Sequence, residues 1–129
     1  VKFRESFRPF APAILTEYAN TYFDIKQSSP HMLIAVNTRS EKISEIPAVV
    51  HVDTSARVQT VSKDNNPRFR KLLECFYEET NCPVILNTSF NVKGQPIVNS
   101  PDDAIKCFLS TNIDVLAIGD FVVNKDDQS

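Results

Sequence analysis

Three basic residues near the start of the chain are the first side chains that could do chemistry. Lys2 and Arg4 stand two positions apart, and Arg8 follows four positions later. In an extended segment, side chains two positions apart point the same way. Lysine offers a point charge, and arginine offers a planar fork that matches two phosphate oxygens. These residues could hold a phosphate. Three basic residues are equally compatible with a solvated, flexible terminus, and the sequence alone leaves both interpretations open.

A second set of polar side chains follows the apolar run 84–86. Four small polar side chains stand in the stretch 87–91: Asn87, Thr88, Ser89 and Asn91. If the run is a strand, they come at its carboxyl end, where open α/β sheets usually bind ligands, and hydroxyls and amides can bond phosphate or ribose oxygens. Asparagine and serine also cap the backbone of ordinary turns. The sequence alone does not decide between a binding site and a turn.

A third group consists of His51, Asp53 and Arg57. We expect a hairpin in which 49–53 and 57–61 pair around 54–56, so that Asp53 either orients Arg57 or accepts the amides of the turn, and the turn is the better interpretation. Arg57 suits either an ion pair or an anion. Metal sites normally need three or more ligands, and His31 is the only other histidine. We therefore expect no metal site.

Composition narrows the classes of protein. The only glycines are Gly94 and Gly119, so a Walker loop and a dinucleotide fingerprint are absent, and side chains would have to hold any phosphates. The net charge is −2, whereas nucleic-acid-binding domains usually carry a large excess of basic residues, so we do not expect a nucleic-acid partner. No apolar run is long enough to cross a bilayer. The three cysteines form no C-x-x-C pair, so we expect reduced thiols in a cytoplasmic protein without a membrane partner.

The elements that must position these residues can be predicted from apolar spacing and capping signals. Helices are expected at 12–23, at 67–80 after an N-cap at Asn66, and from Ser100 onward, where Pro101 and two aspartates follow. The expected core faces of the last two helices are Phe69, Leu72, Leu73 and Phe76, and Ile105, Phe108 and Leu109. Strands are expected at 31–38, 48–53, 57–62, 83–88 and 115–124, with a break near Gly119. This order predicts an α/β (α+β) fold, with an open mixed sheet and helices packed on it, as one domain over 1–124 followed by a polar tail over 125–129.

Three stretches together resemble the C-terminal, YrdC-like domain of the NodU and CmcH family of O-carbamoyltransferases. They read VKFRESFRPFAP at 1–12, HVDTSARVQTV at 51–61, and PVILNTSFN at 83–91 followed by GQPIV at 94–98. They occur in the order that the family shows, and they span about three quarters of the chain. One departure is at Thr54 and Ser55, where the family is expected to show a glycine after the aspartate.

The resemblance implies specific roles for the candidate residues. YrdC-like proteins bind ATP with a K-x-R element and an S-x-N element, which here are Lys2 with Arg4 and Ser89 with Asn91. Arg8, Arg57 and Asn87 lie in the same motifs, and the resemblance implies, less directly, that they also bind ATP or carbamoyladenylate. The two candidate phosphate sites would then be halves of one site.

The resemblance also implies a reaction. Carbamoyl phosphate and ATP, with Mg²⁺, would form carbamoyladenylate in this domain, and the carbamoyl group would pass to the hydroxyl of a small-molecule acceptor in a preceding actin-like domain, which is not in this sequence. No side-chain nucleophile is needed, because fixed charges can align the triphosphate and stabilise its transition state. The alternative is a non-catalytic YrdC-type domain that binds a nucleotide or RNA or that is purely structural.

Overall fold

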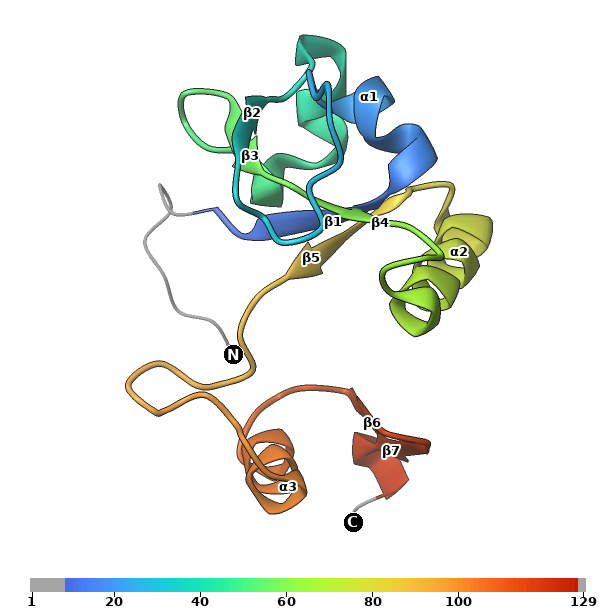
Figure 1. The fold of residues 1–129 in the computed structure, drawn as a ribbon. Helices are drawn as coiled ribbons and strands as arrows, with labels where there is room; N and C mark the ends of the chain where they lie inside the picture. Colours follow the sequence, from blue (N-terminus) through green and yellow to red (C-terminus); the bar gives the residue numbers. More distant parts are fainter. Residues whose placement is uncertain (1–8, 128–129) are drawn as a thin grey trace. The chain divides into compact units, whose positions relative to one another are not determined.

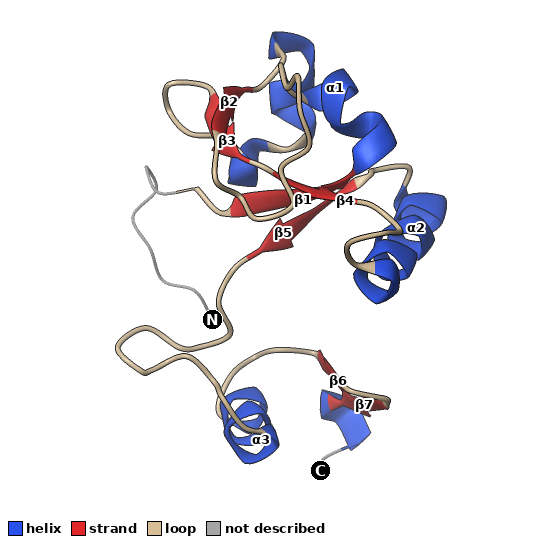
Figure 2. Cartoon of the chain, in the orientation of Figure 1, coloured by secondary structure: helices blue, strands red, loops and turns tan. Residues whose placement is uncertain are grey.

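The computed structural model describes residues 9–127, which form two units (Figure 1). The first unit runs to Thr88, and the second begins at Ser89. Both units contain helices and strands (Figure 2). The chain therefore has the mixed α and β content that the sequence predicts.

A three-stranded mixed sheet lies at the centre of the first unit. Its middle strand is β1 (Ala11–Leu15), which pairs in parallel with β4 (Gln59–Val61) and antiparallel with β5 (Val84–Asn87). Residues 12–15 are all buried. Because β1 has a neighbour on each side and is buried on both faces, its apolar residues run without alternation.

Each face of this sheet has its own apolar cluster. On one side, Leu73 of α2 (Pro67–Thr80) packs with Ala13, Leu15 and Val61. The other cluster includes Ile14 and residues from α1 (Ala19–Tyr22), and it is completed by a two-stranded ribbon in which β2 (Ala35–Asn37) pairs antiparallel with β3 (Ser55–Arg57). Short 3-10 helices at Thr16–Tyr18, Ser40–Glu45 and Pro47–Val49 connect these elements.

The second unit contains one helix and one hairpin. Helix α3 (Pro101–Leu109) packs through Ala104 and Phe108 against Leu116 of β6 (Val115–Ile118), which pairs antiparallel with β7 (Phe121–Asn124). A final 3-10 turn, Lys125–Asp127, follows. The Nζ of Lys125 donates to the carbonyl oxygen of Thr111 at 2.9 Å, which ties the end of the hairpin to the end of α3.

Three predictions are wrong: the helix over 12–23, the hairpin of 49–53 with 57–61, and the strand over 48–53. The helix expected over 12–23 is a strand as far as Leu15 and becomes helical only afterwards, because the unbroken burial of a central strand has no period that separates it from a buried helix. The hairpin of 49–53 with 57–61 does not form. Thr54, at a φ of 68°, closes a tight turn, after which β3 pairs with β2 and β4 pairs with β1. The stretch 48–53 is accordingly not a strand.

Helices α2 and α3 are where the sequence predicts, but their buried faces differ. Asn66 caps α2, since its side chain accepts a hydrogen bond from the amide of Phe69 at 3.3 Å. Leu73 is buried, whereas Leu72 and Phe76 of the expected stripe are exposed. On α3 the smaller residues Ala104 and Cys107 are buried in place of Ile105 and Leu109. Within residues 9–127, no helix has the length and apolar character needed to cross a membrane.

Candidate functional site

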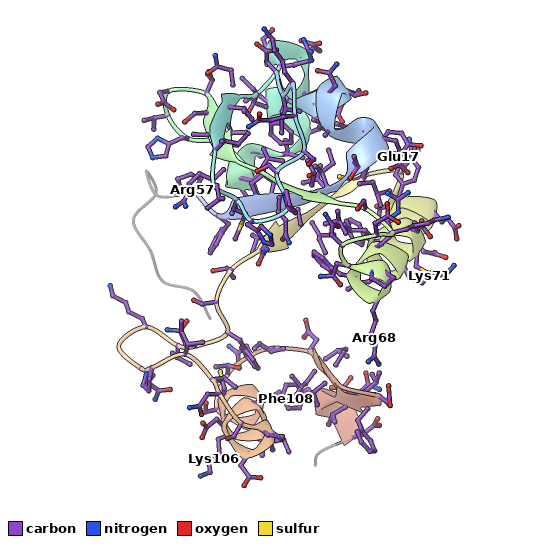
Figure 3. All side chains as sticks on the ribbon, in the orientation of Figure 1. Glu17, Arg57, Arg68, Lys71, Lys106 and Phe108 are labelled. Atoms are coloured by element: carbon purple, nitrogen blue, oxygen red, sulfur yellow. The ribbon has the colours of Figure 1, made fainter. Side chains whose placement is uncertain are left out.

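Two of the predicted site residues in the first unit, Arg57 and Asn87, contact the same residue. Arg57, which is labelled in Figure 3, ends β3. Its Nη2 donates to the carbonyl oxygen of Met32 at 3.3 Å. Asn87 ends β5, and its Nδ2 lies 3.8 Å from the sulfur of Met32. Met32 adopts a left-handed backbone conformation, with a φ of 55°. Residues from two separate strands therefore meet at the loop around Met32.

Gln59 joins this group, although sequence reasoning did not single it out. Its Nε2 donates to the carbonyl oxygen of Pro30 at 3.2 Å, and its Oε1 accepts from Nδ2 of Asn87 at 2.6 Å. The register of the sheet explains the contact: Gln59 is opposite Ala13 and Asn87 is opposite Ala11, so both share one face with two small side chains. No local sequence signal marks Gln59, because its contact depends on the pairing of β4 and β5 with β1.

The charge of Arg57 is not neutralised by a carboxylate in the described part of the chain. Its side chain is exposed, and within residues 9–127 it makes only the hydrogen bond to Met32. The sequence left two roles open for Arg57, an ion pair or the binding of an anion. The ion pair is not formed among residues 9–127. The guanidinium retains N–H donors that can bind an anion.

Asp53 serves the turn and does not orient Arg57. Its Oδ1 accepts from the hydroxyl of Ser55 at 2.6 Å and from the amide of Ser55 at 3.0 Å. These two hydrogen bonds, the hydroxyl's first, lower the pKa of Asp53 from its ordinary value. His51 lies close by, with Nδ1 3.7 Å from the same oxygen. Among the described residues, no group of three or more His, Cys, Asp or Glu side chains is placed to hold a metal ion.

Ser89 and Asn91 contact each other in the second unit. The hydroxyl of Ser89 donates to Oδ1 of Asn91 at 2.7 Å, and Nδ2 of Asn91 donates to the carbonyl oxygen of Gln95 at 3.0 Å. A backbone hydrogen bond from Val98 to Phe90, at 2.9 Å, closes the same loop. The S-x-N element is thus built into a closed loop.

A cavity of about 350 Å³ lies between this loop and α3 in the second unit. Its lining includes the amides of Asn91 and Gln95, the charged side chains of Asp103 and Lys106, and the apolar side chain of Ile97. Small-molecule sites combine apolar walls with a few polar groups, and this volume is at the lower end of their range. The cavity can therefore accept part of a small polar ligand.

The remaining predicted binding residues, Lys2, Arg4 and Arg8, lie outside the described residues. Their assignment to a phosphate site stays a prediction. The described part of the chain thus places four of the seven predicted residues, two in each unit: Arg57 with Asn87, and Ser89 with Asn91.

Comparison with known proteins agrees with the family resemblance found in the sequence. Residues 1–125 match the family model described as carbamoyltransferase C-terminus. The chain is 44% identical to nodulation protein NolO of Bradyrhizobium diazoefficiens, over 97% of the chain and 23% of that protein. It is 37% identical to 3'-hydroxymethylcephem-O-carbamoyltransferase of Streptomyces clavuligerus, over 93% of the chain and 23% of that protein. The chain thus spans about a quarter of the length of these relatives.

Proposed function

The chain belongs to the carbamoyltransferase C-terminus family, and on this premise we propose that it is the nucleotide-handling domain of a larger carbamoyltransferase. Its role would be to form carbamoyladenylate from carbamoyl phosphate and ATP. The Streptomyces relative is named for carbamoylating a 3'-hydroxymethylcephem. By analogy, the final acceptor would be a small molecule with a hydroxyl, bound in a preceding actin-like domain of the full-length protein.

The proposed reaction has a defined balance of bonds. Water removes the phosphate of carbamoyl phosphate and leaves carbamate. A carbamate oxygen then attacks the α-phosphorus of ATP, the bond from that phosphorus to the bridging oxygen breaks, and pyrophosphate leaves. No covalent bond to the protein is formed, so the domain has to align the triphosphate and stabilise the negative charge that develops on it.

The match to the family model over residues 1–125 is the observation that carries the proposal. The chemistry of the described residues supports it. Arg57 offers guanidinium donors that no carboxylate occupies within residues 9–127. Ser89 and Asn91 bring a hydroxyl and an amide, and Lys106 adds a positive charge to the cavity that Asn91 lines. Hydroxyl, amide and guanidinium groups suit phosphate oxygens. Lys2 and Arg4, which lie outside the described residues, stay predicted phosphate ligands.

Magnesium would enter with ATP. Mg²⁺ binds nucleotides largely through phosphate oxygens and water, so the protein need supply only one or two carboxylates. Asp103, which lines the cavity, is a carboxylate suited to such a contact. When bound, the ion would neutralise charge on the phosphates, while the side chains of the chain hold the nucleotide in position.

ATP binding by the chain tests the proposal. We expect calorimetric titration with magnesium at low ionic strength to show weak binding. Replacing Arg57 with alanine should weaken it at least tenfold, because a lost charged hydrogen bond costs about 1.5 to 3 kcal/mol. The control is Lys26→Ala, which removes an exposed charge that makes no hydrogen bond or ion pair within the described residues. Absence of ATP binding, or equal affinity in the two variants, would contradict the proposal.

A further inference from the structure

The outward face of α2 carries apolar side chains that remain uncovered within residues 9–127. Leu73 is buried against the sheet, whereas its neighbour Leu72 is 58% exposed. Phe76 lies one helical turn after Leu72 and is 39% exposed, and Cys75 is exposed beside them. Adjacent apolar side chains that stay in water on one face of a surface helix mark a place where another chain can pack.

The charges of α2 stand in the reverse of the order that a single helix favours. Arg68 and Lys71, both labelled in Figure 3, lie in its first half. Glu78 and Glu79 lie in its last turn, which has no basic residue, and the first turn has no acidic residue. The helix dipole favours acidic groups at the start of a helix and basic groups at its end. Within residues 9–127, Lys71, Glu78 and Glu79 form no ion pair that offsets this cost.

The spacing of the exposed residues shows which arrangement of two helices matches these charges. One line of side chains along the outward face consists of Arg68, Leu72, Cys75 and Glu79. Steps of four, three and four residues are those of the contact seam between two packed helices. When a second copy of the helix lies antiparallel, Leu72 is level with Cys75 of the second copy, and Arg68 is level with Glu79 of the second copy. A parallel arrangement places like charges level with each other.

We propose that α2 is the contact surface of a two-fold symmetric dimer, in which the α2 helices of two copies of this chain pack antiparallel. The symmetry makes every contact occur twice, so opposite charges attract at both ends of the pair. The apolar residues at the centre lose their contact with water, and the two helix dipoles run in opposite directions. A helix of 14 residues is about 21 Å long, so the contact is smaller than that of a permanent dimer, and the association is reversible.

Cys75 provides a direct probe of this arrangement. In the antiparallel pair, the two Cys75 residues are about 4.5 Å apart along the helix axes, because each is level with Leu72 of the other copy, three residues away. A short bismaleimide, which adds one thiol at each of its two ends, should therefore link two chains through Cys75, as located by peptide mass spectrometry. The control chain carries Cys75→Ser and Ser44→Cys, which moves the thiol to another exposed position. Its cross-link should be lost.

Charge reversal tests whether opposite charges hold the pair together. Arg68→Glu with Lys71→Glu makes the charged groups of the outward face all acidic, and Glu78→Lys with Glu79→Lys makes them all basic. Each variant alone should be monomeric in sedimentation equilibrium at low ionic strength, because like charges then meet at both ends. An equimolar mixture of the two variants should restore the dimer. Both pairs of substitutions agree with the helix dipole, so thermal melting of dilute samples should show no loss of stability.

Three results would overturn the inference: a wild-type chain that is monomeric at about 1 mM, association that is unchanged in both charge-reversed variants, or a mixture of the folded variants that stays monomeric. The full-length carbamoyltransferase gives a fourth. If maleimide labels Cys75 in the wild-type chain but not in the monomeric full-length protein, the remaining domains cover α2, and a second copy is not its partner.

Discussion

Arg70 links helix α2 to the segment that follows β1, and its removal should measurably destabilise the first unit. Only 9% of Arg70 is exposed. Its guanidinium donates to both carboxylate oxygens of Glu17, to Glu74 at 2.8 Å, and to the buried carbonyl oxygen of Val61 at 3.1 Å. Arg70→Met would keep much of the aliphatic side chain while removing every one of these donors.

The size of the effect follows from the burial of each partner. Loss of the donor to the Val61 carbonyl should cost about 1 to 3 kcal/mol. The pair with Glu17 adds at most about 1 kcal/mol, because 49% of the Glu17 side chain is exposed and water screens the interaction. A total of about 1 to 4 kcal/mol corresponds to a fall in melting temperature of at least about 4 °C, at about 4 to 8 °C per kcal/mol for a unit of this size. Lys71→Met, at an exposed position on the same helix, should change stability by less than about 0.5 kcal/mol.

The pH dependence gives a further check on the Arg70 prediction. The hydrogen bond from Arg70 lowers the pKa of Glu17, against a smaller opposing effect of burial. A carboxyl group with a lowered pKa in the folded state contributes stability above its unfolded pKa of about 4.3 and loses it as the pH falls further. The stability difference between wild type and Arg70→Met, measured by urea unfolding, should therefore shrink between pH 6 and pH 3. Equal stability at pH 7, or a difference that grows on acidification, would refute this reasoning.

Two further predictions concern the ends of helices. Asn81 follows α2 at a φ of 57°, so Asn81→Ala should destabilise the first unit by about 1 kcal/mol in thermal melting, whereas Asn81→Gly should not, because glycine adopts this conformation without a steric penalty. Equal loss in both variants would contradict this. Ser100 accepts a hydrogen bond from the amide of Asp103 at 3.1 Å, so Ser100→Ala should destabilise the second unit by about 1 kcal/mol and speed hydrogen exchange at that amide. Unchanged exchange at Asp103 would count against the cap.

The parts of the fold that depend on local signals could be predicted from the sequence. The bounds of α2 and its cap at Asn66 follow from neighbouring residues, and so does the start of α3 at Pro101. The pairing of β3 with β2 and of β4 with β1 could not, because it depends on contacts between residues far apart in the chain. The same dependence on distant contacts explains why a helix was predicted where β1 lies. Its buried run is also compatible with a helix until the neighbouring strands are known.

In the candidate site, too, local motifs identified some residues, whereas residues that meet only through strand pairing were missed. Arg57 and Asn87 were named because they lie in recognisable motifs, and the structure brings them to the same loop. Gln59 was missed because its contact with Asn87 depends on the register of both flanking strands with β1, which no local pattern encodes. Asp53 was given two roles, and only the capping of its own turn is realised.

Exchange of labelled pyrophosphate into ATP is the most direct test of the central claim, that this domain forms carbamoyladenylate. It would be measured with the chain joined to the remaining domains of a full-length carbamoyltransferase. We expect label to enter ATP only when carbamoyl phosphate is present, and we expect Ser89→Ala to reduce the exchange while Ser44→Ala, at an exposed position, does not. ATP binding with no carbamoyl-phosphate-dependent exchange would contradict carbamoyladenylate formation and would leave a nucleotide-binding module without this activity.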